Sequence, residues 1–185
     1  KGMSAAEMAY DVLLENDGNN FIYTPLVNYA DHTFNVCQTM LEDKNAIMGL
    51  GDGGAHVGFI LDAGYPTWLI SYWSVKKKVF SMEETIRRLT SDTAIAAGLS
   101  DRGLLKVGLK ADINIIDCDN VGSSDPFMTQ DLPAGGKRLM QHTKGYVATI
   151  VAGKITYKNG NSTKERPGIL VRSVKDSQKV FALSN

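Results

Sequence analysis

The amino-acid sequence predicts α/β units over residues 1–100, followed by a small β-rich unit over residues 101–185. Two observations support this fold class. Before residue 50 the chain alternates helical patterns with short apolar runs, the order expected where helices and strands pack in layers. After residue 100 turn signals separate short runs rich in β-branched and aromatic residues, which is typical of strands.

A capping box predicts the first helix, over residues 4–15. In this box the Ser4 hydroxyl and the Glu7 carboxylate each accept a hydrogen bond from a free amide at the helix start. The glycine and asparagines of residues 16–20 then end the helix, because both residue types tolerate left-handed backbone. A short strand over 21–23 and a second helix over 31–42 are expected next.

The run from Ala46 to Leu50 is apolar without interruption, which suits a parallel strand covered on both faces. Residues 57–73 are rich in glycine and aromatic residues and show no clear period, so they predict a long loop, which in a compact domain is usually functional or partly helical. Its aromatic side chains Trp68, Tyr72 and Trp73 have two interpretations: they line a pocket, or they are core residues.

A second capping box, from Ser81 to Glu84, predicts a helix that is followed by a shorter one over residues 91–97. The apolar side chains of the first of these helices recur at helical spacing and are expected to face inward, with two arginines outside that stripe. The inward set is Met82, Ile86 and Leu89, and the arginines are Arg87 and Arg88.

The β-rich unit begins with an alternating strand over residues 112–117. A long polar connection is expected over 118–136. A hairpin follows, with strands over 146–151 and 154–158, and residues 167–171 predict one edge strand.

Asp52 lies in a glycine cluster, Gly51 to Gly54, directly after the predicted strand at 46–50. A strand that ends in a loop with few side chains can present a catalytic or metal-binding carboxylate. Asp-Gly between apolar runs is also a strong hairpin signal, so a plain turn is the other interpretation.

Composition excludes several classes of protein. Among 185 residues, 20 basic and 20 acidic side chains give zero net charge, which predicts neither a nucleic acid nor an anionic membrane as partner. No apolar run approaches the roughly 20 residues of a membrane span. The cysteines, Cys37 and Cys118, lack metal-site or redox spacing and predict a reducing, cytoplasmic compartment. The start of the sequence, directly before a helix, suggests a chain cut from something longer.

An ordered set of motifs resembles the carboxyl-terminal part of the amidohydrolase superfamily. The set covers nearly the whole chain and consists of Gly51-Asp52-Gly53, residues 84–90, residues 98–103, residues 108–117 and residues 147–158. Within the superfamily the chain looks most like the D-aminoacylase (N-acyl-D-amino-acid deacylase) branch, including the closing Arg166-Pro167-Gly168.

The resemblance implies the last strands and helices of a TIM-type (β/α)8 barrel, with the carboxyl-terminal part of a small β-sandwich. Residues 1–100 would belong to the barrel and residues 101–185 to the sandwich. Such a barrel needs roughly 200 to 250 residues, so this chain would hold only its last two strands or so. Those strands would be 21–23 and 46–50, the seventh and eighth.

The resemblance also assigns a role to Asp52. In the enzymes that this chain resembles, a divalent metal, usually zinc, activates a water, and the aspartate after the eighth strand takes the proton and later passes it to the leaving amine. Asp52 matches that aspartate and is also a possible metal ligand. The implied reaction is hydrolysis of a non-peptide C–N bond in a small-molecule amide, such as an N-acyl amino acid.

The family's other metal ligands have no counterpart in this sequence. The three histidines, His32, His56 and His142, are too dispersed to form a site, and one carboxylate cannot hold zinc usefully. We therefore expect this chain alone to be inactive. His56, with Gly53 and Gly54, is a candidate for substrate contact, although a loop histidine with a structural hydrogen bond is the alternative.

Two further expectations concern the substrate and the assembly. Residues 53–75 contain no arginine or lysine, so this stretch offers no basic side chain to bind a substrate carboxylate. A less anionic acyl amide, a cyclic amide or a carbamate is therefore also a possible substrate. The rival function is a non-catalytic β-rich assembly or interaction module. Open sheet edges would then favour a homo-oligomer.

Overall fold

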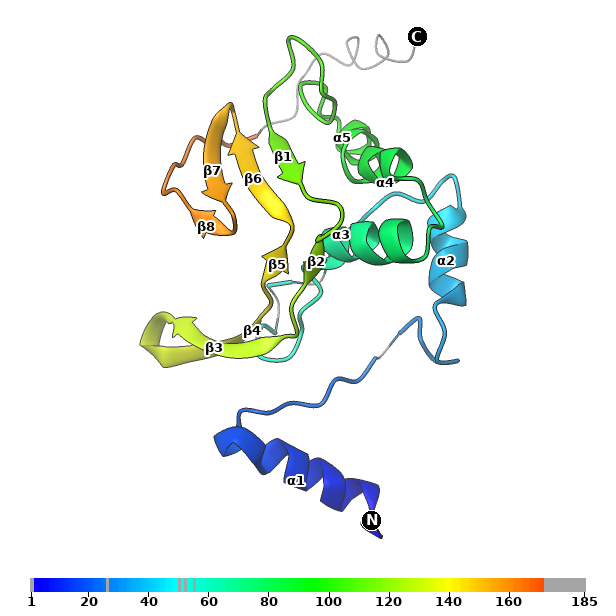
Figure 1. The fold of residues 1–185 in the computed structure, drawn as a ribbon, viewed down its shortest axis with the longest axis vertical. Coiled ribbons are helices and arrows are strands. Elements are labelled where there is room, and N and C mark those ends of the chain that lie inside the picture. Colours follow the sequence, from blue (N-terminus) through cyan, green and yellow to red (C-terminus); the bar gives the residue numbers. More distant parts are fainter. Residues whose placement is uncertain (1, 26, 50, 52, 55, 172–185) are drawn as a thin grey trace. The chain divides into compact units, whose positions relative to one another are not determined.

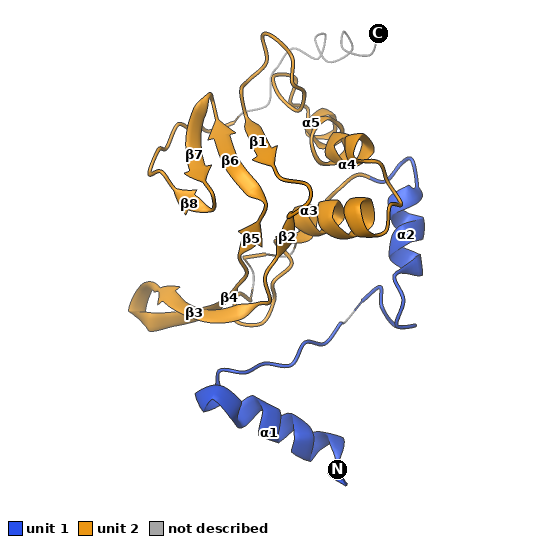
Figure 2. Ribbon diagram, viewed as in Figure 1, with its two compact units in different colours: residues 1–46 blue, residues 47–185 orange. Residues whose placement is uncertain are grey.

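The computed structural model describes residues 2–25, 27–49, 51, 53–54 and 56–171. The chain divides into two units, residues 1–46 and residues 47–185 (Figure 2). This division between residues 46 and 47 is not the one predicted near residue 100, which would separate a barrel portion from a sandwich portion. The division near residue 100 stays a prediction. No described helix is long and apolar enough to cross a membrane.

The first unit holds helices α1 (Ala5–Gly18) and α2 (Asn35–Glu42). The predicted capping box is present: the Glu7 amide donates to Ser4 Oγ at 3.3 Å, and the Ser4 amide donates to the Glu7 carboxylate at 2.8 Å. Regular helical geometry ends where predicted, because Asn16 and Asp17 have positive φ angles of 53° and 55°.

Helix α2 starts later than predicted. Asp31 does not open the helix, because its carboxylate accepts hydrogen bonds from the amide and the hydroxyl of Thr33, at 3.1 and 2.8 Å. This side-chain turn competes with helical backbone. The helix therefore begins at Asn35, within the predicted range of 31–42.

The two strands predicted before residue 50 are absent from the described residues. Residues 21–23 and 46–49 form no strand, and Tyr23 and Ile47 are exposed. Extended chain becomes a strand only by hydrogen bonding to a neighbour, and every described strand lies beyond residue 112, in the second unit. The predictions for 21–23 and 46–49 are therefore wrong for this structure, and Leu50 lies outside the described residues.

The stretch at 57–73, predicted as a long loop that is functional or partly helical, is helical from Tyr65 onward. Helix α3 (Tyr65–Trp68) continues directly into a π-helix, η1 (Leu69–Lys76). Leu69, Ile70 and Trp73 are 2–3% exposed and form the centre of the helical core. The periodicity was hidden because a π-helix closes i to i+5 hydrogen bonds, so its buried face does not follow the usual 3.6-residue pattern.

Helices α4 (Met82–Leu89) and α5 (Ser91–Ala96) follow, and α4 packs against η1. Ser81 caps α4 by accepting from the Glu84 amide at 3.1 Å. Glu83 lies in the first turn, and hydrogen bonds from its own amide and from Ser81 lower the pKa of its carboxyl. Gly98 ends the helical part with the predicted positive φ, 70°.

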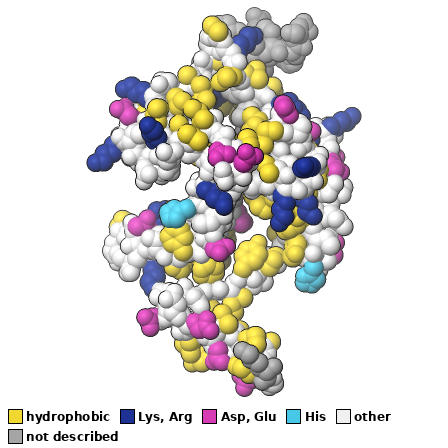
Figure 3. Space-filling view, viewed as in Figure 1, with side chains coloured by type: hydrophobic (Ala, Val, Ile, Leu, Met, Phe, Trp, Pro, Cys, Tyr) yellow, Lys and Arg dark blue, Asp and Glu magenta, His cyan; other side chains and the backbone are white. Residues whose placement is uncertain are grey.

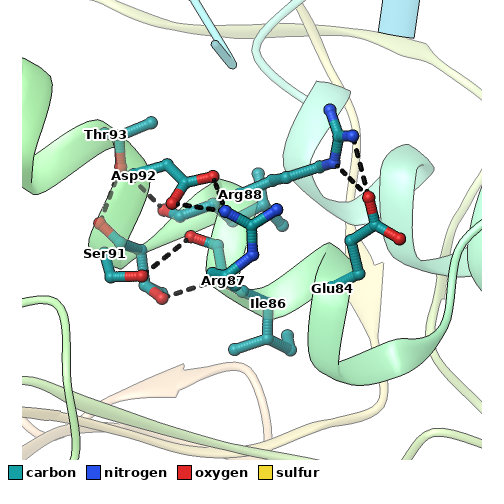
Figure 4. Close-up of polar contacts among 9 residues, drawn as sticks. Glu84, Ile86, Arg87, Arg88, Ser91, Asp92 and Thr93 are labelled. Atoms are coloured by element: carbon teal, nitrogen blue, oxygen red, sulfur yellow. Dashed lines mark hydrogen bonds and ion pairs between the residues drawn. The ribbon is translucent and has the colours of Figure 1, made fainter. Parts of the chain in front are cut away.

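The sequence places Arg88 outside the apolar stripe of its helix, but it is buried. Arg88 is only 8% exposed, and its guanidinium carbon lies 4.8 Å from the centroid of the Phe80 ring. Its Nη2 also contacts Glu84 at 2.8 Å, one turn earlier on α4 (Figure 4). Arg87 points instead toward Asp92 of α5 and remains largely exposed (Figure 4). A long aliphatic stem with a paired head lets an arginine lie in a partly buried position.

The strands form three antiparallel sheets (Figure 1). In the largest, β1 (Ile113–Ile116), β6 (Tyr146–Val151), β7 (Lys154–Lys158) and β8 (Asn161–Ser162) lie side by side in that order. This sheet contains the predicted strand at 112–117 and the predicted hairpin. Hydrophobic side chains gather over the part of the second unit that holds this sheet (Figure 3), and Ile155 and Tyr157 of β7 are 44% and 46% exposed.

The region predicted as a polar connection, 118–136, contains two strands. Strand β2 (Gly122–Ser123) pairs with β5 (Thr143–Lys144), and β3 (Phe127–Leu132) pairs with β4 (Gly136–Met140) through a short 3-10 turn, η2 (Pro133–Gly135). An ion pair between Asp131 and Arg138, at 2.6 Å, joins β3 to β4. The predicted edge strand at 167–171 is absent, since these residues pair with no described strand.

The described residues thus combine helices with antiparallel sheets and do not form a barrel. The parallel strand expected at 46–50 is replaced by irregular backbone over 46–49. Whether residues 101–185 form part of a sandwich stays a prediction.

Candidate active-site segment

The segment from Gly51 to His56 carries the residues singled out by sequence. Asp52 lies outside the described residues, as does Ala55. The Gly53 amide donates to the Gly51 carbonyl at 2.7 Å, which closes a tight turn between these glycines. Neither 46–49 nor 57–60 forms a strand, so the described residues on either side do not make the β-hairpin that Asp-Gly also suggested.

Gly51 and Gly53 are held against the residues that lead into helix α3. A Cβ atom at Gly51 would clash with the Asp62 carbonyl oxygen and lie 2.7 Å from Tyr65 Cδ1. A Cβ at Gly53 would lie 2.7 Å from the Ala63 Cβ. Both positions therefore need glycine for close packing, which fixes the backbone on both sides of position 52. Gly54 has open space around it but a φ of 109°, a conformation that favours glycine.

His56 has a positive φ of 48°, and its carbonyl accepts hydrogen bonds from the amides of Phe59 and Ile60 at 2.9 and 3.1 Å. The imidazole stacks on the Phe59 ring, with centroids 5.2 Å apart and planes inclined by 28°. Within the described part of the chain the imidazole makes no hydrogen bond, so its nitrogens are available for another partner. The alternative of a structural side-chain hydrogen bond finds no support in these contacts.

The segment is tied to the β-rich part of the second unit. The Leu139 amide of β4 donates to the Val57 carbonyl at 2.8 Å. Further along, a Cβ at Gly64 would lie 2.9 Å from Gln141 Oε1. Helix α3 and strand β4 therefore both contact the stretch that carries position 52.

No three-ligand group suited to a metal ion occurs among the described residues. His142 packs on Phe127 at 4.8 Å, and His32 belongs to the first unit. The described donor set therefore does not fit a metal on its own. Asp52, the possible metal ligand named from the sequence, lies outside the described residues.

Of the three aromatic residues Trp68, Tyr72 and Trp73, one is a core residue and two line a groove. Trp73 is 2% exposed and belongs to the core. Trp68 and Tyr72 stack on each other, with centroids 4.8 Å apart and planes inclined by 8°, and line a groove. Lys76 also lines this groove, whereas the basic run over 76–78 in the sequence suggests only a solvated face. Its spacing of four from Tyr72, which itself follows Trp68 by four, was the available signal.

Comparison with known proteins decides the class. The model of the amidohydrolase family matches residues 12–157, which include the glycine turn, helices α2 to α5 and strands β1 to β6. The chain belongs to the amidohydrolase family. Amidohydrolases generally use divalent metals and act on small molecules.

Two curated relatives are dihydroorotases, from Lactobacillus acidophilus and Lactobacillus johnsonii. Each is 33% identical to this amidohydrolase over 89 residues, which are 46% of this chain and 20% of the relative. The match thus spans a fifth of the length of these relatives. No solved structure matches the chain. The comparisons do not single out the D-aminoacylase branch.

Proposed function

We propose that the protein is a metal-dependent amidohydrolase that cleaves a non-peptide C–N bond in a small-molecule amide. The observation that carries this proposal is the family match over residues 12–157, which includes Asp52 and both of its flanking glycines. The two dihydroorotase relatives add support for C–N bond hydrolysis.

In this proposal Asp52 is the catalytic carboxylate. It accepts a proton from the attacking water and later gives that proton to the leaving amine, so one group serves as base and then as acid. Close packing of Gly51 and Gly53 against residues 62–65 supports this role, because a proton-transfer group needs a fixed backbone. His56, whose imidazole is unbonded among the described residues, is proposed to contact substrate together with Gly53 and Gly54.

A divalent metal, which we propose to be zinc, would supply an activated water at neutral pH. Its ligands would have to include groups beyond the described residues, because these contain no cluster of three suitable side chains. We therefore expect this chain by itself to be inactive. The cytoplasmic location suggested by the cysteines stays a prediction.

Two kinds of substrate should be compared. Dihydroorotate is suggested by the names of the two relatives, and N-acyl-D-amino acids are suggested by the sequence motifs. Turnover of either one by the full-length enzyme would identify the branch of the family. An acyl amide without a carboxylate completes the panel, since residues 53–75 offer no basic side chain.

The direct test is Asp52→Asn in the full-length protein. Asparagine keeps the size and polarity of the side chain but cannot take up the proton. We expect kcat to fall by about a hundredfold or more, as for loss of a general base, with bound metal measured in parallel. Near-normal turnover by a metal-loaded D52N enzyme would refute the assignment. Asp62→Asn, a nearby carboxylate that makes no ion pair among the described residues, is the matched control.

A further inference from the structure

A groove of about 470 Å³ lies between the helical and the β-rich parts of the second unit. One wall is formed by helix α3 and the π-helix η1, and the other by β2, β5 and the residues that follow β2. This volume falls within the range of pockets that hold small organic molecules. None of the described residues of the family's motifs takes part in its lining.

The helical wall is aromatic and ends in a cation. Trp68, Tyr72 and Lys76 all line the groove. Trp68 is 37% exposed, and its ring stacks on Tyr72. Lys76 Nζ lies 5.8 Å from the centroid of the Tyr72 ring. These residues belong to or adjoin a π-helix, a rare geometry that is found often at functional sites.

The opposite wall places a second cation beside a glycine. Lys144 pairs in register with Gly122 across β2 and β5. A Cβ at Gly122 would lie only 3.3 Å from Lys144 Cε, so the glycine lets the lysine stem lie close against β2. Gly145 allows the same close approach one residue later, since its Cβ would lie 2.6 Å from Val121 Cα.

The charges that line the groove are two lysines, Lys76 and Lys144, and one carboxylate, Asp125. None of the three forms an ion pair with another described residue, so the groove has a positive balance that is not neutralised. The hydroxyls of Ser71 and Ser123 also make no hydrogen bond within the described residues. Hydrogen-bond donors and a partly exposed aromatic side chain therefore line the same groove.

We propose that this groove is a binding site for a flat aromatic molecule with an anionic group. The ring would pack against Trp68, and the anion would be held by Lys144 and Lys76. Stacking supplies apolar contact, and a charge-assisted hydrogen bond to an ammonium is stronger than one between neutral groups. None of the described residues of the proposed catalytic segment lines the groove, and the proposal does not depend on the role of Asp52.

The probe is 2-naphthoate, with 2-naphthylmethanol as its uncharged analogue and inorganic phosphate as an anion without a ring. Binding to the full chain is followed by titration calorimetry, and the site by shifts of the Trp68 indole signal in NMR spectra. We expect saturable binding of naphthoate at submillimolar concentration, and binding of each single-feature probe weaker by about tenfold.

Two variants locate the site. Lys144→Gln should weaken naphthoate binding by about fivefold to tenfold, because one ammonium is lost. Lys158→Gln makes the same charge change on β7, does not line the groove, and should leave the affinity unchanged. Circular dichroism checks that both variants are folded.

Three results would overturn the proposal: no saturable naphthoate binding to the wild-type chain, equal affinity for naphthoate and 2-naphthylmethanol, or equal losses in K144Q and K158Q. Phosphate binding as tight as that of naphthoate would also reject it, since the ring would then contribute nothing. Because these readouts do not involve turnover, they stand apart from the test of Asp52.

Discussion

Replacing Gly51 by alanine tests whether close packing fixes the segment that carries Asp52. The new methyl group would clash with the Asp62 carbonyl oxygen and lie 2.7 Å from Tyr65 Cδ1. A backbone carbonyl cannot rotate away as the end of a side chain can, and overpacking of this kind costs about 1–3 kcal/mol. The lower entropy of the unfolded alanine chain offsets about 0.4–1 kcal/mol. We therefore expect G51A to lower the free energy of unfolding by about 1–2 kcal/mol.

Gly49→Ala is the matched control. At Gly49 no atom of a described residue other than the chain neighbours lies within 4 Å of the place that an alanine methyl group would occupy. The φ angle is not positive there, so only the entropic term applies. We expect G49A to be as stable as the wild type or more stable by up to about 1 kcal/mol. Urea unfolding of the full chain, with the m value compared between variants, measures both changes. Equal stability of G51A and G49A would refute the packing argument.

The same pair of variants also tests the link to catalysis. If Asp52 is the proton-transfer group, a displaced backbone beside it should lower kcat of the full-length enzyme by about tenfold or more, because reacting groups tolerate little misplacement. G49A should retain wild-type kcat. A G51A enzyme that is destabilised but turns over normally would leave the packing argument intact and contradict the role of Asp52.

Two further predictions concern ion pairs. Arg88→Met should lower the free energy of unfolding by about 1–2 kcal/mol, because the buried guanidinium loses its charge-assisted hydrogen bond to Glu84. Arg87→Met removes the exposed pair and should change the free energy of unfolding by less than about 1 kcal/mol. Equal effects of the two variants in urea unfolding would contradict this prediction. Arg102 donates to Asp101 at 2.8 Å and so lowers the pKa of that carboxyl. A lowered pKa in the folded state stabilises the fold above the carboxyl's ordinary pKa, and this contribution is lost as pH falls through the lowered value. Unfolding measured from about pH 5 down to about pH 2 should therefore show a shallower acid loss in Arg102→Gln, and an unchanged slope would reject the pairing.

Features set by neighbouring residues were predictable from sequence. The side chains of Ser4 and Glu7 each accept a hydrogen bond from the other residue's backbone amide, so this capping box needs no other part of the molecule. Gly98 ends a helix by its own conformational freedom. The hairpin of β6 and β7 is likewise local, because a two-residue turn joins strands of alternating pattern.

Features set by distant partners were not predictable in the same way. The apolar residues 21–23 and 46–49 have strand-like composition, but no described strand pairs with them. Conversely β3 was hidden by polar residues such as Gln130 and Asp131, and its pairing with β4 is held in part by the Asp131–Arg138 ion pair. The pattern of apolar residues also fails to mark a buried position that is occupied by a paired charge, as at Arg88.

The candidate site was predictable only in part, because sequence identifies residue types and the fold decides which of them meet. The motifs named Asp52 and its glycines, and the structure adds why two of those glycines are required: residues 62–65 pack directly on them. Those same residues lead into the α3 and η1 wall of the groove, and Gly64 lies against Gln141, another residue of its lining. A single corner of the chain thus contacts both the glycine turn and the groove. Residues 62–65 therefore contact Gly51 on one side and Gln141 of the groove lining on the other.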